Sequence, residues 1–103
     1  MELVLTGETL PIERLAEHGF LNYPEDTPDA VRARALKLAQ AIAEGAPLSV
    51  MAAKASVLAA MELGYERGVI EADRLHVEVY VSQDAIEGPK AFAEKRKPVW
   101  QGR

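Results

Sequence analysis

Residues 27–47 are TPDAVRARALKLAQAIAEGAP, and this stretch carries the clearest helical signal in the chain. Thr27 can cap a helix N-terminus, and Pro28 suits the first turn, where a missing N–H costs nothing. Gly45 and the proline two residues later end the segment. An apolar stripe runs between these limits at helical spacing, formed by Val31, Ala35, Leu38 and Ile42. The stretch therefore predicts an amphipathic helix with one packed face.

Similar residues at the starts and ends of segments predict helices elsewhere in the chain. A short helix is expected from the first-turn Pro11 to His18, and a longer one after Ser49, a capping residue, with alanines that would let helices approach closely. A final helix is expected from about Pro89 to Lys97. The opening Met1–Thr6 has the pattern of the end of a helix or a short strand, so residues before Met1 are expected in the intact protein.

One longer segment also gives a strand signal. From Leu75 to Val81 apolar and polar residues alternate, which is typical of a strand. A lone strand among helices would have no partner for its backbone groups, and Glu66–Arg74 has a helical pattern. Helix is therefore predicted for Leu75–Val81 too. The chain as a whole is expected to be all-α, with four or five packed helices in one domain, residues 1–103.

Composition limits the function classes. The chain has 49% hydrophobic and 27% charged residues, the range of ordinary globular domains, and no cysteine for disulfides or thiolate chemistry. No apolar run approaches the length of a membrane span, and no secretory signal opens the chain, so a cytoplasmic protein with no membrane partner is expected. The net charge of −4 hides a basic tail after Lys90, too small for a nucleic-acid-binding face. No nucleic-acid partner is expected.

Candidate chemistry is sparse. His18 and His76 have no ligand-spaced companions, so no metal site is predicted. Asp84 and Glu87 lie about one helical turn apart, but their stretch has the composition of a solvated one, so capping and helix-dipole complementation are preferred over acid/base work. No pattern for a nucleophile or a phosphate-binding loop occurs. No catalytic residue is therefore assigned.

Phe92 and Lys95 form the one candidate binding pair. At i and i+3 of a helix they would share a face, where an adenine could stack on the ring while a phosphate met the ammonium. From the residues alone, a core phenylalanine and a basic last turn that complements the helix dipole are the preferred interpretation.

The end of the chain, EGPKAFAEKRKPVWQGR at Glu87–Arg103, resembles the C-terminus of the enoyl-CoA hydratase/isomerase (crotonase) family. The pattern EGxxAFxEKRxPxW is the most specific part. Further resemblances occur in the family's order, namely ELVLTGETL at Glu2–Leu10, LAEHGFLN at Leu15–Asn22 and LAQAIAEGAPLSVMAAK at Leu38–Lys54. Together they span nearly the whole chain but less than half of a typical family member.

The resemblance implies that this chain is the helical C-terminal assembly domain of an acyl-CoA enzyme of fatty acid metabolism, an enoyl-CoA hydratase in the leading interpretation. It implies a coenzyme A thioester as substrate with no permanently bound cofactor, an upstream catalytic core that is absent here, and homo-trimers or hexamers. The core would supply the oxyanion hole and two glutamates, so this chain alone is expected to be inactive. The resemblance also implies that Phe92 and Lys95 contact the adenine and phosphates of CoA. His76 stands where relatives often carry an aromatic residue, which leaves its role open.

Two alternatives remain. The ending DAIEGPxAFAEKRxPxWxGR is especially similar to that of carnitinyl-CoA dehydratases, so a dehydratase of this type is one. The other is a non-catalytic helical assembly or binding module.

Overall fold

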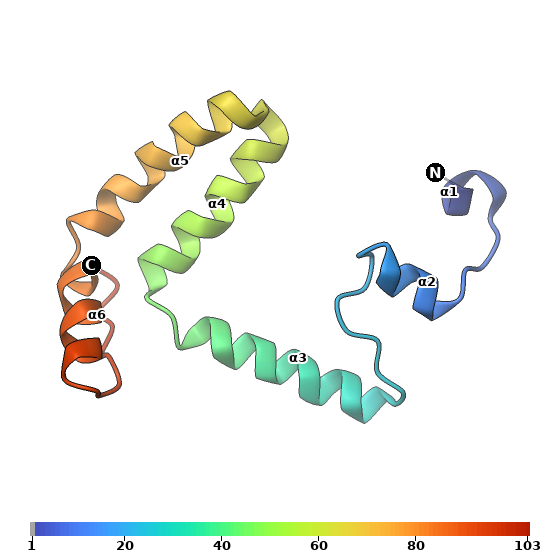
Figure 1. The fold of residues 1–103 in the computed structure, drawn as a ribbon, viewed down its shortest axis with the longest axis horizontal. Coiled ribbons are helices and arrows are strands. Elements are labelled where there is room, and N and C mark those ends of the chain that lie inside the picture. The colour runs from blue at the N-terminus through green and yellow to red at the C-terminus, as the bar shows by residue number, and fades with distance from the viewer. Residues whose placement is uncertain (1) are drawn as a thin grey trace. The chain divides into compact units, whose positions relative to one another are not determined.

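The computed structural model describes residues 2–103, and every regular element among them is a helix. The six helices are α1 (Glu2–Thr6), α2 (Ile12–Glu17), α3 (Pro28–Ala43), α4 (Pro47–Leu63), α5 (Tyr65–Tyr80) and α6 (Gln83–Ala93) (Figure 1). The all-α prediction is confirmed. The count exceeds four or five because the opening segment forms a five-residue helix of its own. Met1, with which that segment was predicted to begin, lies outside the described residues.

The chain divides into two compact units, and the boundary between them falls within α3, between Leu38 and Ala39. The first unit contains α1, α2 and most of α3, and the second contains the rest of the chain. The assignment of residues 1–103 to a single domain stays a prediction.

In the first unit, a side chain caps the start of α3, as predicted, but no side chain caps the start of α2. The Ala30 N–H donates to Thr27 Oγ1 at 3.2 Å, directly before Pro28 opens α3. Pro11 was predicted to lie in the first turn of its helix, but it precedes α2 as the N-cap residue and its side chain offers no hydrogen bond. α2 is consequently a short helix without side-chain capping.

In the second unit, α4 and α5 lie side by side as a helical hairpin (Figure 1). The turn between them is Gly64, whose φ of 79° is a conformation that glycine adopts without a steric penalty. A Cβ placed on Gly68 would lie 2.5 Å from the Cα of Ala60, so the two helices touch backbone to backbone. The close approach predicted from the alanines of α4 is therefore confirmed.

Two predicted boundaries of the hairpin can be compared with the structure. Helix is confirmed for the segment that alternates, because α5 continues to Tyr80. The capping role predicted for Ser49 is wrong, since α4 already begins at Pro47 with Ala46 as its N-cap. The proline in the first turn fixes this start, and Ser49 lies within the helix.

The last helix is displaced from its predicted position by a full turn or more. α6 begins at Gln83, because Ser82 caps it by accepting the Ala85 N–H at 3.1 Å, and not at Pro89, which lies inside the helix. It ends at Ala93 and not at Lys97. The residues from Gln83 to Pro89 are therefore helical, and Lys95 to Lys97, which were predicted to form the last turn, lie beyond the helix.

No single helix in the described part of the chain has the length and apolar composition to cross a membrane; α3 and α4 reach them only when taken together across the break between them.

Candidate functional site

Phe92 and Lys95 both lie at the solvent-exposed end of α6. The Phe92 side chain is in the last turn of the helix and 87% exposed, so the interpretation of this residue as core does not fit the described chain. Lys95 is also exposed. A ring and an ammonium are thus available to a ligand at the same helix end.

Phe92 and Lys95 were predicted to share one face of a helix. Instead, Lys95 lies beyond the end of α6, in the turn that follows the helix. The Lys95 N–H donates to the Phe92 carbonyl at 3.2 Å, and the Arg96 N–H donates to the Ala91 carbonyl at 3.0 Å. This pair of bonds is the Schellman motif, in which the residue after the C-cap takes a left-handed conformation and is usually glycine. Here that residue is Lys95, with φ of 52°. Lys95 therefore has a backbone conformation that residues with a side chain rarely adopt.

After this turn the chain runs back along α6 and is fastened to it by two carboxylates. Asp84 Oδ1 accepts the Gln101 N–H at 2.7 Å, and its Oδ2 accepts the Gly102 N–H at 2.9 Å. Glu87, about one turn further on, accepts the Val99 N–H at 2.8 Å. We call residues 97–103 the return segment. Figure 1 shows it beside α6, ending near the start of that helix.

Two further bonds hold the return segment. The Gln83 N–H donates to the Arg103 carbonyl at 2.6 Å, and the Trp100 indole N–H donates to the Glu44 carbonyl at 2.7 Å. The first of these gives an unpaired N–H of the helix start an acceptor. The return segment therefore completes the hydrogen bonding of α6 as well as receiving support from it.

Sequence reasoning missed this arrangement because it placed Asp84 and Glu87 in solvent. Asp84 is only 4% exposed, and both of its oxygens are occupied. The available signal was the spacing of the two acids on one helix face, followed by a proline- and glycine-containing tail whose backbone N–H groups need acceptors.

Glu87 also forms an ion pair that changes its acidity. Arg96 donates from its two terminal nitrogens to Glu87 Oε1 and Oε2, at 2.5 and 2.9 Å. Together with the Val99 N–H, these bonds lower the pKa of Glu87 from its ordinary value of 4.5 to about 2. The bonds that Arg96 donates to Glu87, and a further one to Glu94, raise the pKa of Arg96. Both groups are therefore charged throughout the neutral range.

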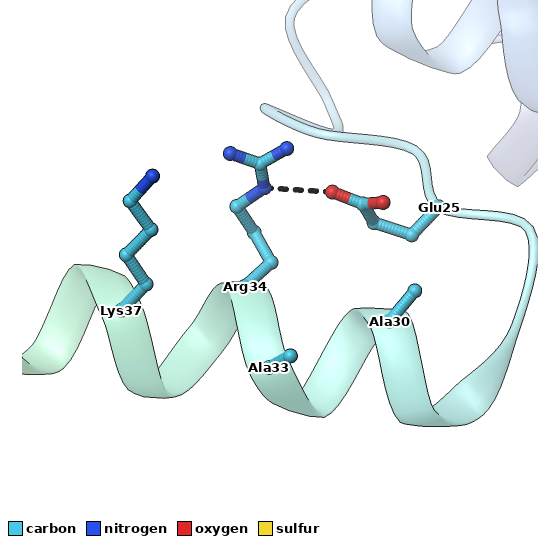
Figure 2. A pocket seen from close by; sticks show the side chains of 5 residues that line it. All are labelled: Glu25, Ala30, Ala33, Arg34 and Lys37. Atoms are coloured by element: carbon cyan, nitrogen blue, oxygen red, sulfur yellow. Dashed lines mark hydrogen bonds and ion pairs between the residues drawn. The ribbon is translucent and has the colours of Figure 1, made fainter.

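A second cationic cluster lies in the first unit (Figure 2). Arg34 of α3 donates from Nε to Glu25 Oε1 at 2.7 Å, and its guanidinium lies 5.0 Å from the centre of the Tyr23 ring. Lys37 extends from the same side of the helix one turn later. Glu25 therefore neutralises the charge of Arg34 within this cluster.

The histidines have local partners. His76 Nδ1 lies 2.7 Å from the Ala72 carbonyl and its ring lies 6.2 Å from that of Tyr80, while His18 is the C-cap of α2. Among residues 2–103, no three His, Asp or Glu side chains gather as metal ligands would. The His76 side chain thus has partners on its own helix, whereas His18 contributes its backbone N–H to the end of α2.

A family model described as enoyl-CoA hydratase/isomerase matches residues 1–103. The carnitinyl-CoA dehydratase of Citrobacter koseri is 39% identical over 106 residues, covering 99% of this chain and 40% of that protein. The homologous dehydratase of Salmonella typhi is 38% identical with the same coverage. The chain thus spans about 40% of the length of these curated relatives.

Solved structures give the same result. An enoyl-CoA hydratase from Mycobacterium tuberculosis superposes with a TM-score of 0.90 at 39% identity, over 100% of this chain and 40% of its own. A probable enoyl-CoA hydratase/isomerase from Mycobacterium abscessus gives 0.86 at 42% identity, with the same coverage. Since the match extends over the whole chain in both sequence and structure, the chain belongs to the enoyl-CoA hydratase/isomerase family.

Proposed function

We propose that this chain is the helical C-terminal part of an enoyl-CoA hydratase, and that it contributes Phe92 and Lys95 to the binding of the CoA thioester substrate. The observation that carries the proposal is the exposed ring and ammonium at the end of α6, in a chain that matches the family throughout. The adenine would stack on the Phe92 ring, and a phosphate would pair with the Lys95 ammonium.

The rest of the enzyme would cover surfaces that this chain leaves open. Ala60 of α4 contacts Gly68 of α5, while Val57 and Met61 of α4 are 61% and 79% exposed. Large apolar side chains that stay exposed on one helix are typical of a surface that further protein covers. This supports assembly with a catalytic core, and with further copies in a trimer or hexamer. We further propose a cytoplasmic enzyme of fatty acid metabolism with no permanently bound cofactor.

A carnitinyl-CoA dehydratase is the second candidate, and the identity of 39% to the Citrobacter koseri enzyme favours it. The same CoA site would serve either reaction, because the acyl end of the substrate is the part that differs. Turnover of carnitinyl-CoA against short enoyl-CoA thioesters by the intact protein separates the two. A non-catalytic module is contradicted by turnover of either substrate.

Lys95→Gly in the intact protein tests the CoA site, because glycine suits φ of 52° and the variant loses the ammonium without loss of folding. We expect CoA affinity to fall about fivefold, or about 1 kcal/mol, which is less than for a buried hydrogen bond to a charged group because Lys95 is exposed. Calorimetry with CoA measures this change. Lys97→Gly, two residues on, removes the same charge outside the turn and is the matched control. Equal affinity in the wild type and Lys95→Gly would remove Lys95 from the site.

A further inference from the structure

The position of Lys95 depends on residues beyond its own helix. Left-handed backbone is uncommon for residues other than glycine, and it persists where the surroundings fix it. On one side of Lys95 the helix supplies that support through the Phe92 carbonyl. On the other side the Arg96 N–H donates to the Ala91 carbonyl, and the Arg96 side chain is held separately by carboxylates.

Arg96 is held by two carboxylates at once. Its Nε donates to Glu94 Oε2 at 2.6 Å, and its terminal nitrogens donate to both oxygens of Glu87 at 2.5 and 2.9 Å. Glu87 Oε1 also accepts the Val99 N–H. Glu87 therefore fixes the chain at the residue after Lys95 and again three residues later.

The same contacts leave the Lys95 ammonium free. Arg96 occupies Glu87 and Glu94, which are the nearest carboxylates in sequence, and Lys95 takes part in no ion pair within residues 2–103. If Arg96 were released, Glu94 and Glu87 would become available to Lys95. The ion pair thus both shapes the turn and protects the charge that a phosphate would meet.

We propose that Glu87 is a positioning residue for the adenine nucleotide of CoA, acting through Arg96 and the turn that presents Lys95 beside Phe92. The inference rests on the proposed CoA site. For CoA affinity, the positioning role and simple electrostatics predict changes of opposite sign. Removing a negative charge near an anionic ligand should tighten binding, whereas loss of positioning should weaken it.

The test compares three variants of the intact protein. Glu87→Gln removes the charge from the pair, and Arg96→Lys keeps the net charge but loses the two-point contact. Glu71→Gln is the matched control, because Glu71 also accepts two bonds from an arginine, Arg74, at 2.9 and 2.5 Å on α5. Affinities are measured by calorimetry for CoA and for 4′-phosphopantetheine, which lacks the adenine nucleotide. Thermal unfolding of each variant checks that it folds.

We expect Glu87→Gln and Arg96→Lys each to weaken CoA binding about fivefold, on the scale of coupling between contacting residues, with Glu71→Gln unchanged. Affinity for 4′-phosphopantetheine should not change. In a Lys95→Gly background, Glu87→Gln should have no further effect on CoA affinity. If one variant fails to fold, the other carries the same prediction.

Unchanged or tighter CoA binding in the folded variants would overturn the positioning role while leaving the CoA site intact, provided that Lys95→Gly weakens binding. Equal losses for CoA and 4′-phosphopantetheine would also overturn it, because they would report a general structural defect. If Lys95→Gly itself has no effect, the proposed site fails and the positioning role with it.

Discussion

The α4–α5 hairpin and the α6 end of the same unit are held together by different forces. In the hairpin, small apolar side chains let the helices touch at Gly68 and Ala60, and no described side-chain hydrogen bond or ion pair joins α4 to α5. At α6, carboxylates and backbone N–H groups hold the return segment, and the buried residues include Ser82 and Asp84. One region depends on shape and the other on hydrogen bonds.

This difference indicates where each region depends on the rest of the protein. The hairpin leaves several large apolar side chains of α4 uncovered, among them Met51, Val57 and Met61, so their burial requires further protein. The α6 region satisfies its polar groups internally and leaves an aromatic ring and an ammonium exposed at its tip. The uncovered apolar side chains of α4 and the exposed ring and ammonium at the end of α6 are thus separated along the chain.

The largest effect is expected where the hairpin depends on shape. Gly68→Val should destabilise the intact protein by about 3 kcal/mol, because its Cβ would meet the Ala60 backbone and the helices would have to separate. Gly88→Ala in α6 is the control, since a Cβ there lies at an ordinary 3.4 Å from the Trp100 ring. That variant should be neutral or more stable by up to about 1 kcal/mol, the helix preference for alanine. Denaturant unfolding measures both, and an equal loss at the two sites would remove the distinction between the regions.

A smaller effect is expected where α6 depends on hydrogen bonds. Asp84→Asn keeps the shape of the side chain but replaces one acceptor oxygen with a donor facing a backbone N–H. The expected cost is about 2 kcal/mol, the scale of hydrogen bonds to a charged group. Hydrogen exchange should show faster exchange at Gln101 and Gly102, while the hairpin amides keep their protection. Faster exchange spread evenly over both regions would contradict a local role.

The sequence predicted the hairpin better than it predicted the α6 region. Periodicity and turn residues identified the helices and the close hairpin packing, because both depend on local spacing and side-chain size. The end of α6 was predicted four residues too late, at Lys97 in place of Ala93. Lysine at a left-handed position gives no local signal for the end of a helix. The contact of Asp84 with Gln101 and Gly102 spans 17 and 18 residues, and no periodic pattern encodes it.

The pKa of Glu87 gives the smallest effect and the most specific test of the polar region. Its pKa is lowered from 4.5 to about 2 by Arg96 and the Val99 N–H, so folding favours the ionised form. Its stabilising contribution should be complete above about pH 5 and decline as the pH falls towards 2, as the carboxylate binds a proton and releases Arg96. The stability difference between the wild type and Glu87→Gln should therefore shrink between these values. Denaturant unfolding at pH 3 and pH 6, with Glu71→Gln as the comparison on the hairpin, measures it. A difference that stayed constant with pH would mean that Glu87 holds the return segment by hydrogen bonding alone, and that its charge contributes nothing to the stability of the turn at Lys95.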